Sequence, residues 1–401
     1  MIIAMHGWPM SAVQAFPRRR LSRKNIFLQH KKLPEVTTIV DYLIEKEFHD
    51  DPRHAKSPAF ARWTAAQNAM PRDLSHAGLM PPEADRIDVV YLWVDGADPR
   101  WQANRRAAQA RTGDDAGAAR FGDVSGRYRD NGELRYNLRA LQRFFPDHGH
   151  VHIVTDGQCP AWLRTGPEPG VSVVDHRALM PAAALPVFDS GHIETYLHHL
   201  PGLSERFIYF NDDVFLGAPF DAAWWFSEAG LAVFKEAALL PDYPAPQPHE
   251  SALVNASLLS RAWLCARDPH YRHVPRIFAH SPRPMLVSAM RQLEHEAPEL
   301  FHNVRSTVFR SWTAPPLIPD LVPRWMVHLG RAIVRESESA YLSSGAADAA
   351  EQFGELCNRF GKLDFFCIND TSDDAAPDAP QLRRIGDTLK QLLPCPSRFE
   401  H

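Results

Sequence analysis

The stretch RFIYFNDDVFLG, residues 206–217, decides the fold. Residues 207–210 are apolar and largely aromatic, a composition typical of a short buried strand. The run stops abruptly at Asn211, Asp212 and Asp213, and apolar residues resume directly afterwards. We therefore expect a buried strand whose carboxyl end carries three polar side chains.

Asp212 and Asp213 place two adjacent carboxylates between apolar flanks. Such carboxylates are costly to desolvate unless a cation neutralises them. Hard cations such as Mg²⁺ bind carboxylate oxygens and leave coordination positions open for phosphate. The pattern predicts a divalent-metal site, and the alternative is a strand-end turn in which Asn and Asp cap the loop.

Further strand-like and helical runs precede this stretch. The strand-like runs are 87–94 (IDVVYLWV), 151–155 (VHIVT) and 171–174 (VSVV). One helical pattern, 134–145, lies between the first and second runs, and another, 191–200, lies after the third. Strands alternating with helices in this order predict an α/β fold with a mainly parallel sheet and flanking helices. Ligands bind beyond the carboxyl ends of strands in such sheets, so Asp95 and Gly96 are candidate ligand contacts. Asp-Gly is also the commonest loop signal.

The segment RYRDNGELRYNLRALQRFFP, residues 127–146, begins with a dense polar set. Asp130 and Glu133 have the spacing of a capping box, and leucines then recur at helical intervals. Free N–H groups at a helix N-terminus favour anions, although charges there usually serve capping and solvation. The candidate ligand-binding residues of this segment are Arg127, Arg129, Asp130, Asn131, Glu133 and Arg135.

The C-terminal half predicts a helical insertion, with helices over 252–265 and about 284–299. Basic and imidazole residues gather in this insertion, and some of them are candidates to bind phosphate or move protons. His270 and His273 have a spacing that could bind a metal, but without a carboxylate or Cys partner a surface role is the alternative. FFCIND, residues 365–370, repeats the pattern of an apolar run ended by polar residues, here Asn369 and Asp370.

Residues 1–84 carry no chemical motif and are interpreted as an extension, with an amphipathic helix over 36–48 and basic residues clustered at 18–24. Residues 376–401 are expected to form a tail with one short helix.

A net charge of -4 gives no reason to expect nucleic-acid binding. Five cysteines without CxxC spacing favour a reducing compartment. With no apolar run of about 18 residues, we expect a cytoplasmic protein that associates peripherally with the inner face of a membrane through its basic cluster.

Four separated stretches together resemble the Stealth family of sugar-phosphate transferases, over roughly residues 86–370. The regions are 86–101 (with IDVVYLWVDGADPRW), 127–217 (with RYRDNGELRYNLRALQRFFP, HIVTDGQCPAWL and RFIYFNDDVFLG), 252–312 (with NASLL, AHSPRPML and FRS) and 364–371 (with FFCIND). The third region is the most divergent, because Thr307 stands where the family commonly has His. The resemblance places a catalytic domain over residues 85–375.

The resemblance implies a GT-A-like fold, a requirement for Mg²⁺ or Mn²⁺, and transfer of hexose-1-phosphate from a UDP-sugar to a glycan hydroxyl with release of UMP. It implies that Asp212 and Asp213 hold the metal, helped by Asn369 and Asp370. Arg310 is the implied phosphate-binding residue and His280 the implied general base, with His273 as its rival. Asp95, Gly96, Asn211 and the polar set of 127–135 are implied to line the nucleotide and sugar pocket. The alternatives are a glycosyltransferase that releases UDP and a non-catalytic carbohydrate-binding protein.

Overall fold

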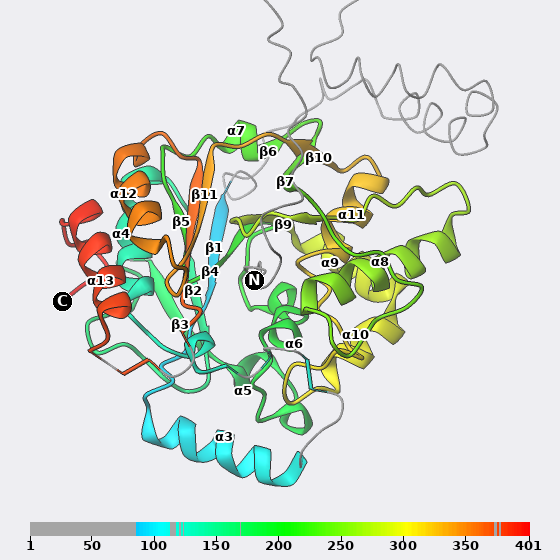
Figure 1. Cartoon of the computed structure of the whole chain (residues 1–401), viewed down its shortest axis with the longest axis horizontal. Coiled ribbons are helices and arrows are strands. Elements are labelled where there is room, and N and C mark those ends of the chain that lie inside the picture. The colour runs from blue at the N-terminus through cyan, green and yellow to red at the C-terminus, as the bar shows by residue number, and fades with distance from the viewer. Residues whose placement is uncertain are drawn as a thin grey trace, which may run out of the picture. The chain divides into compact units, whose positions relative to one another are not determined.

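The computed structural model describes residues 86–112, 118, 119, 122, 124–168, 170–372, 375, 376 and 378–401 (Figure 1). The chain divides into one unit of residues 2–80 and another that holds residues 81–401. All described residues belong to the second unit. The helix predicted over 36–48 and the basic cluster at 18–24 lie outside the described residues.

The central sheet has five strands in the order β3-β2-β1-β4-β9. Their bounds are β1 Ile87–Leu92, β2 Val151–Thr155, β3 Val171–Asp175, β4 Arg206–Asn211 and β9 Arg283–Leu286. β1 is parallel to both β2 and β4, and β2 is parallel to β3, whereas β9 is antiparallel to β4. The predicted α/β fold with a mainly parallel sheet and flanking helices is confirmed.

A second sheet, in the order β11-β12-β5, continues the chain beyond the two aspartates. It consists of β5 Val214–Leu216, β11 Ser339–Ser343 and β12 Phe365–Asn369. β12 pairs antiparallel with β5, and the Ile368 N–H donates to the Asp213 carbonyl at 3.0 Å. The end of β12 therefore lies beside the end of β4, which brings the Asn-Asp of the FFCIND run next to the earlier Asn-Asp-Asp.

A third sheet lies in the second half of the chain. It contains β6 Phe226–Ser227, β7 Gly230–Leu239 and β10 Ala332–Arg335, and β8 Arg276–Phe278 pairs with β7. Among the helices of the described residues, none has the length and apolar composition needed to span a membrane.

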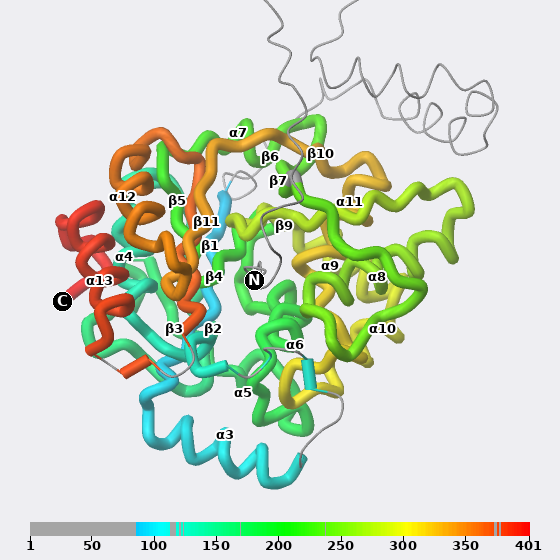
Figure 2. Tube along the Cα trace, viewed as in Figure 1, coloured from blue at the N-terminus to red at the C-terminus, as the bar shows by residue number. Residues whose placement is uncertain are grey.

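Two groups of helices lie on opposite sides of the central sheet (Figure 1). Their bounds are α3 Pro99–Thr112, α4 Glu133–Phe144, α5 His176–Leu179, α6 Ser190–Glu194, α7 Ala222–Trp225, α8 Ala252–Arg267, α9 Val287–Glu296, α10 Pro298–Arg305, α11 Leu321–His328, α12 Ala349–Arg359 and α13 Pro380–Leu392. Helices α4, α12 and α13 lie on one side and α8 to α11 on the other (Figure 1). The α12 and α13 helices lie beside α4 in the trace, and α13 contacts both (Figure 2). Leu134, Leu138 and Leu141 of α4 are fully buried, as the helical pattern predicted.

Two predicted helices are wrong in their limits. The helix expected from about 284 is strand β9 followed by α9 and α10, since Pro284 is tolerated on an edge strand and Pro298 begins a new helix. The helix expected over 191–200 ends at Glu194 and continues as a 3₁₀ turn, Leu197–His199. Nothing in the local sequence marks that break. The insertion over 252–312 is largely helical as predicted, but it also supplies β8 and β9.

Candidate active site

A cavity of about 250 Å³ opens at the carboxyl ends of β1 and β4. This is the sheet edge at which parallel α/β folds bind ligands. The sequence-predicted residues that line it are Arg127, Arg129, Glu133, Asn211, Asp212, Asp213, His280, Arg310, Asn369 and Asp370. Segments far apart in the sequence thus meet at one place.

Acidic side chains crowd together on one wall of the cavity. Burial, and then the neighbouring charges of Glu133, Asp213 and Asp130, raise the pKa of Asp212 well above its usual range. Burial raises the pKa of Glu133 to about 8, with a contribution from Asp130. Neutralising this cluster with a divalent cation would let the carboxylates ionise at neutral pH.

The loop before α4 differs from the predicted capping box. The helix begins after Gly132, which adopts a left-handed conformation with φ 89°, and no side chain caps it. Asp130 instead accepts a hydrogen bond from the Gly132 N–H at 2.8 Å. Glu133 turns back to accept from the Asn131 backbone N–H at 2.6 Å and side-chain amide at 2.8 Å. The two acids stabilise a tight turn, and Glu133 reaches the cavity from it.

His280 lies against the second aspartate of the pair. Its Nε2 is 3.5 Å from Asp213 Oδ1 and 3.3 Å from Asn211 Nδ2. The Cys367 thiol donates to the other carboxylate oxygen of Asp213 at 3.5 Å. Burial lowers the pKa of His280, and the charge of Asp213 opposes that shift. A neutral imidazole in this position can accept a proton.

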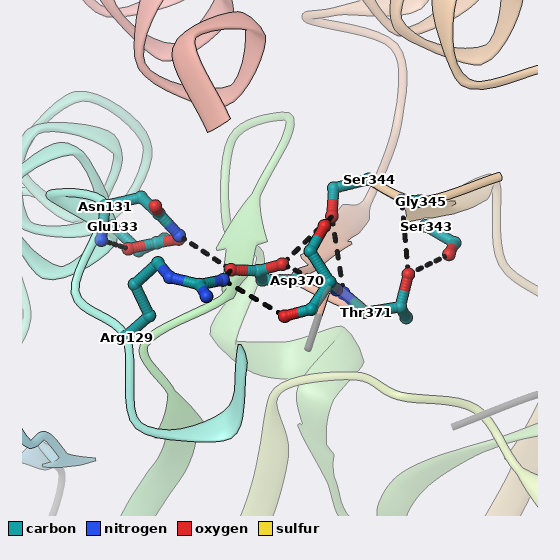
Figure 3. A network of polar contacts seen from close by, with 9 residues as sticks. Arg129, Asn131, Glu133, Ser343, Ser344, Gly345, Asp370 and Thr371 are labelled. Atoms are coloured by element: carbon teal, nitrogen blue, oxygen red, sulfur yellow. Dashed lines mark hydrogen bonds and ion pairs between the residues drawn. The ribbon is translucent and has the colours of Figure 1, made fainter. Parts of the chain in front are cut away.

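Asp370 ties the loop before α4 to the end of β12, as Figure 3 shows. One of its carboxylate oxygens pairs with Arg129 and lies 3.5 Å from the Asn131 amide. The other accepts from the Ser344 hydroxyl at 3.1 Å and the Ser372 N–H at 2.9 Å. Because both oxygens are engaged, Asp370 is better placed to position the loop than to bind a metal.

Arg310 is held at the rim by two residues that the sequence reading missed, Asp189 and Ser190. Its Nη2 donates to the Ser190 hydroxyl at 2.5 Å, and its Nε lies 3.8 Å from Asp189. The Thr307 hydroxyl donates to Asp189 at 2.9 Å, so threonine at this divergent position orients the carboxylate beside the arginine. Burial, and then the charge of Arg310, lower the pKa of Arg127 to about 9. Two guanidinium groups close enough to repel each other make a site for an anion.

Five predicted residues do not line the cavity: Asp95, Gly96, Asp130, Asn131 and Arg135. The Gly96 N–H donates to the Tyr128 carbonyl at 2.7 Å, and a Cβ there would lie 2.3 Å from that oxygen. Asp95 accepts from the Ala97 N–H within the same turn. These residues, with Asp130 and Asn131, support the loop that carries Arg127 and Arg129.

Arg135 is a clear correction, because it faces away from the cavity. Its Nε donates to Glu400 near the C-terminus at 2.5 Å, and Arg139 binds the same carboxylate through two nitrogens. Since Leu134 and Leu138 face the core, the turn of the helix carries Arg135 to the side covered by the C-terminal tail.

His273 and His270 are likewise outside the cavity lining. The Nε2 atom of His273 lies 3.0 Å from the Ser257 hydroxyl, and burial lowers its pKa to about 3. Among the described residues, neither histidine belongs to a group of three side chains that could hold a metal ion. The structure gives no support to a metal site at His270 and His273.

An aromatic wall and one acid complete the cavity. Trp93, Trp101, Tyr128 and Phe188 line it, and Trp101 contacts both Tyr128 and Phe188. Glu194 also lines it, from the C-terminal residue of α6. Among these, only Trp93 belonged to a stretch that sequence reasoning had placed at a strand end. The local sequence gave no indication that the other residues line a site.

The donor set fits the divalent cation that the acidic pair predicts. Asp212, Asp213 and Asn369 offer carboxylate and amide oxygens, which Mg²⁺ and Mn²⁺ prefer. The raised pKa of Asp212 is the observation that supports this fit, because its charged neighbours Glu133, Asp213 and Asp130 are all acidic. At Asp213 the effect of burial is outweighed by His280, and the pKa of Asp213 is lowered.

Curated relatives are similar in sequence to this domain. The chain is 36% identical over 316 residues to an exopolysaccharide phosphotransferase of Streptomyces coelicolor, covering 78% of this chain and 52% of that protein. It is 32% identical over 334 residues to exopolysaccharide phosphotransferase CpsY of Mycobacterium tuberculosis, covering 80% of this chain and 60% of that protein. The chain therefore spans about half to three fifths of the length of these relatives.

Solved structures give a more distant likeness. The galactosyltransferase LgtC, solved with donor and acceptor sugar analogues, matches with a TM-score of 0.37 and 11% identity, over 78% of this chain and 98% of that chain. Mouse xyloside xylosyltransferase 1 matches with a TM-score of 0.34 and 11% identity, over 73% and 99%. A TM-score this low does not decide the fold, which rests on the sheet topology.

Three family models match separate parts of the domain. Conserved region 1 of the Stealth proteins matches residues 85–113, conserved region 2 residues 127–234 and conserved region 4 residues 359–401. Together they contain β1, the loop before α4, the Asn-Asp-Asp stretch and the end of β12. The chain belongs to the Stealth protein family.

Proposed function

We propose that this protein transfers hexose-1-phosphate from a UDP-sugar to a hydroxyl of a glycan, releasing UMP, in exopolysaccharide synthesis. One observation carries the proposal: an acidic pair, a neutral imidazole and the guanidinium groups of Arg127 and Arg310 line one cavity. Phosphoryl transfer depends mainly on positioning and on neutralising phosphate charge, and these groups supply both. The names of the curated relatives support the same class of reaction.

The proposed step is a displacement at the sugar-bearing phosphorus. The acceptor oxygen forms a bond to this phosphorus, the bond between the phosphorus and the UMP oxygen breaks, and the sugar-phosphate moves to the glycan as a diester. The His280 imidazole takes the proton of the acceptor hydroxyl. Arg310 and Arg127 bind phosphate oxygens, and Asp189 holds Arg310 in place.

Asp212 and Asp213, with Asn369, would hold Mg²⁺ or Mn²⁺ beside the diphosphate. When bound, such a cation neutralises charge on the phosphate oxygens and on the leaving UMP. Asp213 has a second role, because it also contacts His280 and orients the ring.

The test is product analysis with a panel of UDP-sugars and Mg²⁺, with and without candidate glycans. We expect UMP as the released nucleotide, and Asp213→Ala as the control that abolishes its release. Release of UDP would identify a glycosyltransferase instead, and binding without any turnover would identify a carbohydrate-binding protein.

We further propose that the protein works at the cytoplasmic face of a membrane. The proposed UDP-sugar donor and the basic residues clustered at 18–24 favour this location. Removing residues 1–30 should weaken recovery in the membrane fraction while UMP release persists. Native protein found outside the cytoplasm would contradict the proposal.

A further inference from the structure

Arg283 is the first residue of β9 and lies opposite Tyr209 of β4. Its side chain lines the active-site cavity. It belongs to the basic and imidazole residues of the insertion, from which the sequence did not single it out. Within the part of the chain that the structure describes, its guanidinium makes no hydrogen bond, ion pair or ring contact.

Arg324 is an arginine with a structural role in the same domain. Its guanidinium donates to Asp320 at 2.7 Å, to the Val274 carbonyl at 2.8 Å and to the Arg276 carbonyl at 2.6 Å. The side chain is 3% exposed, and its charge is balanced by Asp320. Arg283 has none of these features, so the two residues form a matched pair for comparison.

The electrostatic surroundings of Arg283 are unbalanced. Burial lowers the pKa of Arg283, yet a guanidinium stays protonated in proteins. Glu194 is the acid whose charge opposes this shift most, and Asp320 opposes it less. Burial raises the pKa of Glu194 to about 7. When Glu194 is neutral, Arg283 keeps only the weaker influence of Asp320, and a guanidinium with so little counter-charge is costly to hold out of bulk water.

Glu194 has one oxygen that could accept a further hydrogen bond. One of its carboxylate oxygens accepts from the Tyr209 hydroxyl at 2.9 Å, while the other, Oε2, is buried and has no hydrogen-bond partner. The same hydroxyl oxygen lies 2.6 Å from Asn211 Oδ1, which links this corner to the His280 side of the cavity. An unpartnered guanidinium and an unpartnered carboxyl oxygen therefore lie in one corner of the site.

We propose that Arg283 is an anion-binding residue that takes a phosphate or carboxylate group of the substrate, with Glu194 Oε2 beside it for a substrate hydroxyl. The flat fork of guanidinium donors matches the two oxygens of either anion. The inference rests on the proposed function only for the source of the anion. That source is either the phosphate of the donor or the acidic group of a charged sugar.

The first experiment is titration of the full chain with inorganic phosphate and, separately, with glucuronate. We expect Arg283→Gln to bind at least one of these anions about 10- to 100-fold more weakly than the parent protein, as loss of a charge-assisted contact implies. Weakened phosphate binding alone assigns the donor phosphate, and weakened glucuronate binding alone assigns an acidic sugar. If the parent binds neither anion, or the variant binds both as tightly, the proposal is overturned.

The second experiment separates binding from a structural role. Thermal unfolding without ligand should show Arg283→Gln to be at least as stable as the parent, because the change removes a half-buried charge that makes no ion pair with a described residue. Arg324→Gln, which breaks a fully paired arginine, should lower the unfolding temperature. If both variants are destabilised alike, Arg283 is structural and the inference fails.

Neither experiment depends on turnover. A protein that binds phosphate through Arg283 but releases no UMP would refute the proposed function and leave this inference standing. A protein that releases UMP with Arg283→Gln and the parent binding both anions equally would do the reverse.

Discussion

The acidic wall of the cavity predicts that the metal-free protein loses stability as pH rises. Burial raises the pKa of Glu133 from 4.5 to about 8, so the folded protein keeps a proton that the unfolded chain releases between these values. The unfolded state then binds fewer protons, and the free energy of unfolding falls with increasing pH across that window. At about 1.4 kcal/mol for each pH unit, the loss from this one group reaches about 3 kcal/mol at neutral pH.

The assay is denaturant unfolding in EDTA, followed by tryptophan fluorescence from about pH 5 to about pH 8. Glu133→Gln cannot ionise, so its stability should change less steeply with pH than that of the parent. The comparison uses slopes because Gln also disturbs the two hydrogen bonds from Asn131. Glu355→Gln, at an exposed position on α12, is the matched control. Added Mg²⁺ should stabilise the parent most at the higher pH, where it competes with fewer protons. Parallel pH profiles for the parent and Glu133→Gln would refute this reasoning.

Three further predictions concern single side chains. Asp213→Ala should abolish UMP release, and Asp212→Ala should reduce it as much or less, with circular dichroism unchanged; near-normal turnover of both at saturating Mg²⁺ would refute the metal assignment. His280→Ala should lower turnover by about 10²- to 10⁴-fold while UDP-sugar binding persists, and His273→Ala should lower thermal stability and keep turnover; the opposite pattern would move the base to His273. Glu400→Ala should lower the unfolding temperature because two arginines of α4 lose their shared carboxylate, and an unchanged temperature would show that the tail does not stabilise the domain.

The strands were the most predictable part of the fold. Residues 151–155 form β2 with the predicted limits, and β4 extends the predicted run by one residue at each end. Continuous apolar runs ended by charged residues have few other stable arrangements, because both faces must be buried. The same reasoning placed Asp212, Asp213 and Asn369 at strand ends, where they line one cavity.

The remaining features depend on contacts between distant segments. Pro284 lies in an apolar run that suits a helix as well as a strand, and only the free edge of β4 decides between them. Arg135 belongs to the polar set by sequence, but Glu400 draws it to the other side of α4. The pairing of Arg310 with Asp189 follows from packing between distant segments, which no local pattern encodes. The same holds for the position of Arg283, whose guanidinium has no hydrogen-bond or ion-pair partner among the described residues.

The most direct test of the central claim follows the sugar-bearing phosphate. The protein would be incubated with Mg²⁺, an acceptor glycan and a UDP-sugar that carries radioactive phosphorus only at that position. We predict that the label appears in the glycan as a phosphodiester, that the released UMP is unlabelled, and that EDTA stops the transfer. Label that leaves with the nucleotide as UDP, while unlabelled sugar joins the glycan, would contradict the account.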